Sequence, residues 1–173
     1  YLTNQNKNLK QLIDSDETLF ETNIIIAKVL LDKDSPYIKS IIINKGSQAG
    51  VLIGMPVLDK DFLIGRVVET NYMSSRVLLL TDLNSRIPVT LGDDNTQAIL
   101  KGNGGSRLSL EYLPENYIIE DGVTVFTSGK DQIFKQGTPV GVTDEKGSVI
   151  LFSEPNQLSI IKIDLNITTK ENF

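Results

Sequence analysis

The chain has 173 residues, a formal net charge of -5, and neither cysteine nor histidine. A chain of this length can bury a core as one domain or two small ones, so it needs no disulfide or structural metal to fold. The missing thiol and imidazole groups argue strongly against a zinc site and exclude a Ser-His-Asp triad. The acidic balance argues against nucleic-acid binding, which needs a basic face.

The first residues carry a helical pattern. Four apolar residues at spacings typical of one helical face occur within residues 1–19: Leu2, Leu9, Leu12 and Ile13. Because so short a helix is marginal in water, we interpret it as the end of a longer coiled coil, with chance leucine spacing as the alternative. The chain starts without a methionine or a leader and contains no apolar run long enough for a membrane helix, so we expect it to be a piece of a longer protein.

From Asn23 onward the sequence changes to short aliphatic and β-branched runs bounded by Gly, Pro, Asn, Asp or Ser, a pattern that predicts strands. The runs are 23–32, 39–44, 54–59, 62–69, 75–82, 86–91, 96–102, 107–113, 122–128, 138–143, 148–153 and 158–167. Their spacing is typical of sandwiches and barrels. We therefore expect an all-β fold, with two small β-barrels preceded by a short N-terminal helix.

Two arrangements of the barrels fit this pattern. In the favoured one, residues 48–107 form one barrel, and residues 20–47 return to pair with residues 108–168 in the other. The first and last apolar runs look like partner strands that close one barrel, which is the reason for this preference. In the alternative, the barrels follow one another along the chain, with a boundary near residues 100–113.

The remaining catalytic options are weak. Carboxylates cluster in predicted turns, where solvated acids are usual, as at Asp59/Asp61, Asp93/Asp94 and Asp144/Glu145. Ser128 and Lys130 share a glycine-containing turn, without the desolvated lysine that a Ser-Lys pair needs. The glycine-rich stretch 102–106 has no helix after it, so it reads as a hairpin loop and not as a phosphate cradle. We expect no catalytic, metal or cofactor site.

The sequence predicts structural roles for two polar residues in the strand region. Asp82 follows an apolar run and precedes a turn, so its side chain is expected to accept backbone N–H bonds. Arg66 lies inside a predicted strand, where it is expected to pair with an acid such as Asp82 or Glu69, or to cover apolar surface with its stem.

Short elements in a fixed order carry a family resemblance over about residues 24 to 167. They are Lys45-Gly46-Ser47, Gly50-Val51, Gly54-Met55-Pro56-Val57, Leu63-Ile64-Gly65-Arg66-Val67, Leu79-Leu80-Thr81-Asp82, Pro88-Val89, Thr127-Ser128-Gly129 and Pro139-Val140-Gly141. In this order and spacing they resemble the extracytoplasmic domain of the MreC family of rod shape-determining proteins. The chain departs from the family at Phe62, where glycine is usual, and after Phe134, where proline is common.

The resemblance implies a non-catalytic scaffold. Members of the family have a short cytoplasmic tail, one membrane helix, a coiled coil and two β-barrels outside the cytoplasmic membrane. They self-associate as dimers or filaments, and they bind the elongation-specific penicillin-binding protein and the membrane protein MreD to organise lateral peptidoglycan synthesis. For this chain the resemblance implies a periplasmic location, with membrane anchoring only through an upstream helix absent from the sequence.

Candidate partner-binding anchors are apolar residues in predicted loops: Phe62, Tyr72, Met73 and Phe134. Local loop packing is the alternative role for each of them. Two other functions stay open. A peptidoglycan- or glycan-binding module would have a thin aromatic platform, because the chain has no tryptophan and only five tyrosines. A degenerate trypsin-like barrel hydrolase is disfavoured by the missing histidine.

Overall fold

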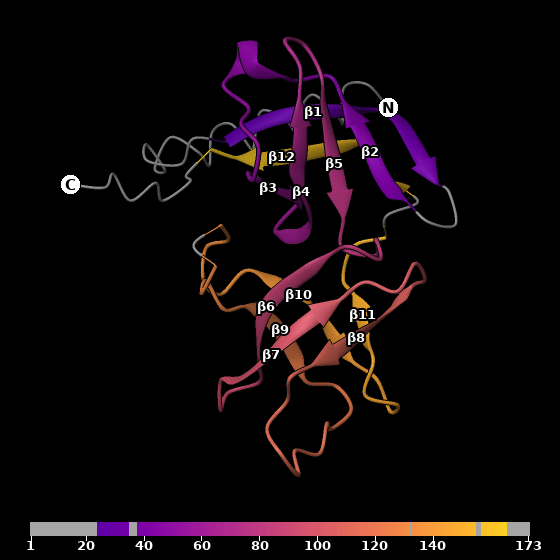
Figure 1. The fold of residues 1–173 in the computed structure, drawn as a ribbon, viewed down its shortest axis with the longest axis vertical. Coiled ribbons are helices and arrows are strands. Elements are labelled where there is room, and N and C mark those ends of the chain that lie inside the picture. Colours follow the sequence, from indigo (N-terminus) through magenta and orange to yellow (C-terminus); the bar gives the residue numbers. More distant parts are fainter. Residues whose placement is uncertain (1–23, 35–37, 132, 155–156, 166–173) are drawn as a thin grey trace, which may run out of the picture.

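The computed structural model of the chain describes residues 24–34, 38–131, 133–154 and 157–165. Two β-barrels lie one above the other along the long axis of the molecule (Figure 1). This confirms the expected all-β fold with two barrels. The helical face expected from Leu2, Leu9, Leu12 and Ile13 lies outside the described residues. Within the described ranges, no helix has the length and hydropathy that crossing a bilayer requires.

The first barrel is built from strands at both ends of the described chain. Its strand order is β1-β12-β3-β4-β5-β2, and each neighbouring pair is antiparallel. The strands are β1 (Ile24–Asp34), β2 (Lys39–Ile43), β3 (Pro56–Asp59), β4 (Phe62–Thr70), β5 (Ser75–Leu79) and β12 (Ile160–Asp164). β1 pairs with β12 with Ile26 opposite Lys162, so the two chain-distant runs close this barrel as the sequence predicted.

The second barrel is continuous in sequence. Its strand order is β10-β11-β8-β7-β6-β9, again with antiparallel neighbours. The strands are β6 (Arg86–Leu91), β7 (Thr96–Lys101), β8 (Arg107–Glu111), β9 (Thr124–Thr127), β10 (Pro139–Thr143) and β11 (Val149–Leu151). The whole unit enters between β5 and β12, so one barrel is inserted into the other.

The barrel boundaries expected from the sequence were wrong. The inserted barrel runs from β6 to β11, whereas residues 48–107 were expected, and β3, β4 and β5 belong to the outer barrel with β1 and β2. The reason is pairing at the far edge of β5, where Leu78 lies opposite Ser40 of β2. The sequential alternative fails as well, because residues 100–113 lie inside the second barrel, where Leu100 is paired with Leu110.

Each barrel has its own apolar core. In both, buried and less buried residues alternate along strands, as in β5 of the first barrel and β9 of the second, because successive side chains point to opposite faces. β4 contributes to both cores: Ile64 packs in the first, and the preceding Leu63 packs in the second with Leu80. This shared strand joins the two cores and fixes the barrels to one another.

Buried polar contacts complete the junction between the barrels. The Asp82 carboxylate is fully buried and accepts N–H bonds from Lys39 at 2.8 Å and from Asn84 at 2.8 Å. The bond from Asn84 confirms the turn closure expected for Asp82, while the bond from Lys39 ties β2 to the same carboxylate. Gly102 lies against this turn, and a Cβ there would be 2.0 Å from the Asp82 carbonyl oxygen, so only glycine fits. Glu69, one of the partners expected for Arg66, pairs instead with Arg76 at 3.1 Å.

Candidate interaction surface

Three of the acidic residues singled out in the sequence, Asp59, Asp94 and Asp144, accept hydrogen bonds. Asp59 accepts a bond of 2.6 Å from the Ser153 hydroxyl, and Asp94 accepts one of 3.1 Å from the Thr96 hydroxyl. In the described part of the chain, no group of three or more acidic side chains is arranged to hold a metal ion. These contacts stabilise a turn and the junction between the barrels.

Asp144 is the acid with the clearest electrostatic signature. Backbone N–H groups of Ser148 and Lys146, each 2.9 Å from Asp144 Oδ1, and the nearby Arg107 guanidinium hold the pKa of this carboxyl below its usual range. Partial burial opposes this shift. The carboxylate closes the turn between β10 and β11, which is a structural role.

Two loops meet at the end of the first barrel that lies away from the second (Figure 1). They are residues 47–54, which include the short 3-10 helix η2 (Ser47–Ala49), and residues 70–74 between β4 and β5. The Ser47 N–H donates to the Asn71 carbonyl at 2.8 Å, and the Gln48 N–H donates to the Tyr72 carbonyl at 3.0 Å. A Cβ on Gly46 would be 2.1 Å from the Asn71 carbonyl oxygen, so glycine permits this close contact. The two loops therefore form one fixed unit, which we call the apical surface.

The apical surface presents large apolar side chains to solvent. Leu52, Ile53, Tyr72 and Met73 are 55%, 63%, 66% and 68% exposed. The neighbouring Val51 and Met55 are buried in the first core, which anchors the loop while the residues between them point outward. Residues 46–58 and 70–75 contain no charged side chain. Exposed apolar residues grouped in this way mark interaction sites.

The four predicted anchors have three different environments. Tyr72 and Met73 lie on the apical surface, where a partner can reach them. Phe62 is half-buried at the barrel junction, where its ring lies 5.1 Å from that of Phe152. Phe134 is 5% exposed and packs in the second core, so the prediction of a surface anchor there was wrong. In the same loop, Asp131 Oδ1 accepts the N–H of Phe134 at 3.4 Å.

Leu52 and Ile53 were missed as anchors. The available signal was three consecutive apolar residues, Val51 to Ile53, beside glycines at 50 and 54. Such a run in a tight turn cannot bury every side chain, so part of it must face solvent.

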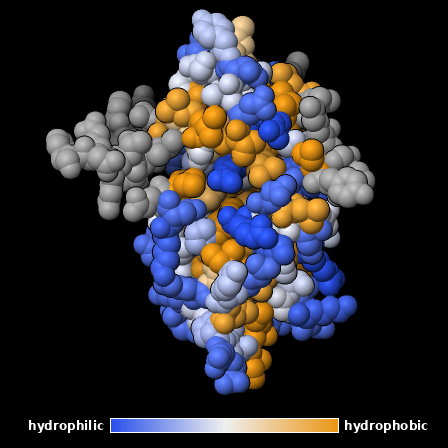
Figure 2. Space-filling model, in the orientation of Figure 1, coloured by the Kyte–Doolittle hydropathy of each residue, from blue (hydrophilic) through white to orange (hydrophobic). Residues whose placement is uncertain are grey.

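A second exposed apolar group lies on the outer face of the first barrel. Ile24 and Ile26 of β1 and Ile160 of β12 are each more than two-fifths exposed. On the paired strands they lie beside Lys28 and Lys162, so this face mixes apolar and charged groups. The hydropathy of one side of the molecule is shown in Figure 2, where apolar residues occur on both barrels. The apical surface differs in carrying no charge at all.

Comparison with known proteins connects this architecture with one family. Residues 29–167 match the model of the family described as rod shape-determining protein MreC, barrel core. Cell shape-determining protein MreC of Caulobacter vibrioides is 38% identical over 141 residues, which are 79% of this chain and 41% of that protein. The chain thus spans less than half the length of that curated relative.

Solved structures show the same fold. A structure described as MreC superposes with a TM-score of 0.79 at 31% identity, covering 94% of this chain and 98% of that one. A solved complex between penicillin-binding protein PBP2 and MreC from Helicobacter pylori contains a chain with a TM-score of 0.64 at 17% identity, covering 84% of this chain and 99% of that chain. At that identity the likeness shows the fold alone. With a family-model match over both barrels and the same fold in a solved MreC structure, this chain belongs to the MreC family of rod shape-determining proteins.

Proposed function

We propose that this chain is the non-catalytic scaffold part of a cell-elongation assembly. In this role it self-associates and binds the elongation-specific penicillin-binding transpeptidase and MreD, and so organises lateral peptidoglycan synthesis and maintains rod shape. It works on the periplasmic side of the cytoplasmic membrane, anchored by a transmembrane helix upstream of this sequence. Membership of the family supports the scaffold role, and the Helicobacter pylori complex supports a penicillin-binding protein as partner.

The apical surface identifies the residues that we expect to contact the partner. Its loops are fixed by backbone bonds such as that from Gln48 to Tyr72 at 3.0 Å, so binding costs little ordering of the chain. Burying a large apolar side chain contributes about 1.5–3 kcal/mol when burial is complete. The absence of charge from residues 46–58 and 70–75 means that a partner does not have to desolvate an ion there. We therefore expect the transpeptidase to cover this surface with an apolar patch of its own.

The test is binding of this chain to the extracytoplasmic part of the transpeptidase from the same organism, by biolayer interferometry at physiological salt. The double variant Tyr72→Ser/Met73→Ser is expected to weaken binding at least tenfold. That factor corresponds to about 1.4 kcal/mol, less than the full burial of either side chain contributes. Because the contact is apolar, raising the salt concentration is expected to change the affinity of the original chain very little.

Tyr112→Ser is the matched control for this experiment. Tyr112 is 83% exposed in the second barrel, so the change removes the same kind of side chain far from the apical surface. Unchanged binding is expected for this variant. Equal loss in both variants would remove the apical surface from the interface. If the folded chain, verified by circular dichroism, shows no binding at concentrations where the complete MreC protein binds, the proposed contact lies elsewhere.

A further inference from the structure

A groove opens on the second barrel, outside both apolar cores. It has a volume of about 600 Å³ and lies between the turn after β6, the long connection from β8 to β9, and the first residues of β9. Acidic, aromatic and aliphatic side chains are part of its lining: Asp93, Asp94, Tyr117, Ile118, Glu120 and Val123. This volume is in the range of ordinary ligand pockets. Nothing in the scaffold role proposed above uses this groove.

The walls of the groove are fixed to the barrel. The Gly92 N–H donates to the Thr124 carbonyl at 3.0 Å, which holds the first wall against β9. On the other side, the Thr143 hydroxyl accepts the Val123 N–H at 2.9 Å and donates to the Glu120 carbonyl at 2.6 Å. The groove is therefore present before any ligand arrives, which lowers the entropic cost of binding.

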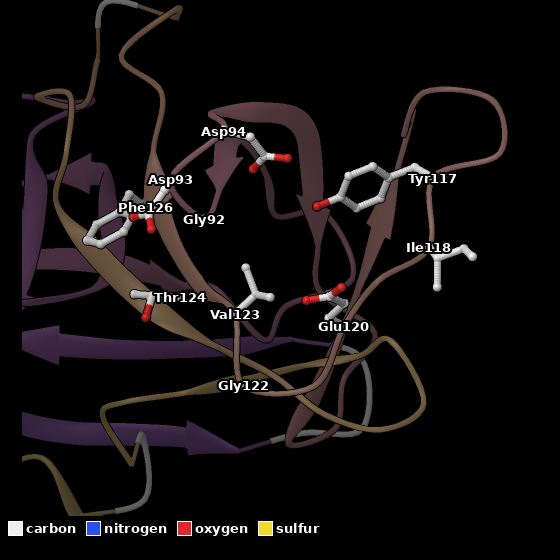
Figure 3. Close-up of a pocket in the computed structure, with 10 residues that line it drawn as sticks. All are labelled: Gly92, Asp93, Asp94, Tyr117, Ile118, Glu120, Gly122, Val123, Thr124 and Phe126. Atoms are coloured by element: carbon white, nitrogen blue, oxygen red, sulfur yellow. The ribbon is translucent and has the colours of Figure 1, made fainter.

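Figure 3 shows how the side chains are arranged. The carboxylates of Asp94 and Glu120 and the hydroxyl of Tyr117 face a common space, and Val123 lies at its edge beside Glu120. The ring of Phe126 lies on the β9 side, and Ile118 points away from the space. Ile118 is 83% exposed, although it is a large apolar residue. A long connection that holds an apolar side chain in water is typical of a binding loop.

The charged side chains that line the groove have one sign. Asp93, Asp94 and Glu120 line the groove, and no lysine or arginine occurs among residues 112–126 or 87–100. An anionic ligand would be repelled from such a site. Among the described residues, no group of three or more acidic side chains is arranged to hold a metal ion, and this disfavours a metal as the occupant.

We propose that this groove binds an arginine side chain presented by a partner polypeptide. The carboxylates of Asp94 and Glu120 complement the charge of a guanidinium group, which can form paired hydrogen bonds with carboxylates. The flat guanidinium also packs on aromatic and aliphatic surface, here offered by Tyr117 and Val123, and lysine is less suited to such packing. A peptide that crosses the groove can place an apolar neighbour of the arginine against the exposed Ile118. The inference does not depend on the identity of the transpeptidase partner.

The experiment is a nuclear magnetic resonance titration of the isotope-labelled chain with a blocked Gly-Arg-Gly peptide. Saturable shifts are expected at the backbone amides of Gly92 and Gly122, and added salt is expected to weaken them because the ion pairs are exposed to solvent. The matched ligand is the same peptide with citrulline, which keeps the shape of arginine and removes its charge. Binding of the citrulline peptide is expected to be at least several-fold weaker.

Two variants test whether the side chains that line the groove bind the peptide, or whether the negative charge of the whole region attracts it. Glu120→Gln removes a lining carboxylate and is expected to weaken arginine-peptide binding by roughly two- to fivefold, the range of one exposed ion pair. Glu115→Gln removes the same charge from the same connection, outside the lining, and is expected to leave binding unchanged. Unaltered amide shifts in β10 and β11 confirm that each variant is folded. Equal loss in both variants, equal binding of the citrulline peptide, or no shifts at the groove amides would each overturn the proposal.

Discussion

The two barrels have the same strand number and the same antiparallel pairing, yet the chain closes them differently. The first depends on the contact between β1 and β12, where Ile24 lies opposite Asp164. The second is complete between Arg86 and Leu151. Closing a barrel through strands far apart in sequence carries a larger loop-closure entropy. The inserted barrel reduces that cost once it is folded, because it brings the end of β5 and the start of β12 into one compact unit.

The surfaces at the two ends of the molecule differ as well. The apical surface of the first barrel is apolar and uncharged, while the groove of the second carries Asp93, Asp94 and Glu120. An apolar contact is nearly insensitive to salt, and an exposed ionic contact weakens as salt screens it. The two barrels are thus suited to different partner chemistries, and salt dependence separates their contributions.

The largest expected effect comes from truncating one core at a time. Ile163 of β12 is fully buried in the first core, and Leu100 of β7 is buried to a similar degree in the second. Ile163→Ala and Leu100→Ala are each expected to lower the free energy of unfolding by about 2–5 kcal/mol. Hydrogen exchange measures where the loss appears: Ile163→Ala should accelerate exchange in β1 and β3, and Leu100→Ala in β6 and β8.

An effect of either truncation on both barrels would contradict this expectation. Leu63 of β4 packs in the second core while the adjacent Ile64 packs in the first, so the barrels share a strand. If either truncation accelerates exchange equally in both barrels, they unfold as one cooperative unit. The contrast between a self-contained barrel and a barrel closed by its ends would then fail.

The strands and the fold class were predictable because period-2 alternation and turn residues are local properties of the sequence. The partnership of β1 and β12 was predictable from their matching apolar runs. The barrel boundary was not, because hairpins such as β3–β4 and β6–β7 have the same local pattern whichever barrel they join. What decides membership is the far edge of β5, where Ser40 and Leu78 meet across a large sequence separation.

The candidate interaction residues were predictable only in part. Their positions in predicted loops made Tyr72, Met73 and Phe134 candidate surface anchors. A loop residue can face either solvent or the core, and the local sequence does not decide which. The burial of Phe134 depends on space in the second core, which is formed by strands far apart in the sequence. The groove depends on three segments that meet only in the fold, so no local motif indicates it.

An intermediate effect is expected at the junction, where one carboxylate bonds β2 of the first barrel and the turn that leads into the second. Asp82→Ala leaves the N–H groups of Lys39 and Asn84 without this acceptor. Hydrogen bonds to charged groups typically contribute about 1.5–3 kcal/mol, and solvent can replace the bond at the exposed Asn84, so we expect a loss of about 2–3 kcal/mol in chemical denaturation. Asp82→Asn keeps one oxygen acceptor and should lose less. A loss confined to one barrel in hydrogen exchange would show that this carboxylate does not couple the two.

The smallest effect is expected at Asp144, and it belongs to the second barrel. Its pKa in the folded chain is lowered by the Ser148 and Lys146 N–H groups and by Arg107, which lies 3.1 Å from the carboxylate. A lowered folded-state pKa means that the stabilisation is fully present above the unfolded-state pKa of about 4 and is lost as the pH falls through the folded-state pKa. Asp144→Asn removes this titration, so its deficit in unfolding free energy relative to the original chain should be largest near neutral pH and shrink in acid.

The neighbouring Glu145 is exposed and provides the matched control. Glu145→Gln changes the net charge by the same amount without touching the bonds that close the turn between β10 and β11, so its effect on unfolding free energy should be small at every pH. The location of the change is the sharper measurement, because β10 and β11 are strands of the inserted barrel alone. Acid should therefore accelerate hydrogen exchange in β10 and β11 relative to Asp144→Asn, after correction for the intrinsic pH dependence of exchange, and leave β1 and β12 unchanged. If Asp144→Asn keeps the same deficit from neutral pH into acid, the charge of Asp144 does not stabilise this turn, and the acid response of the two barrels is not set by this residue.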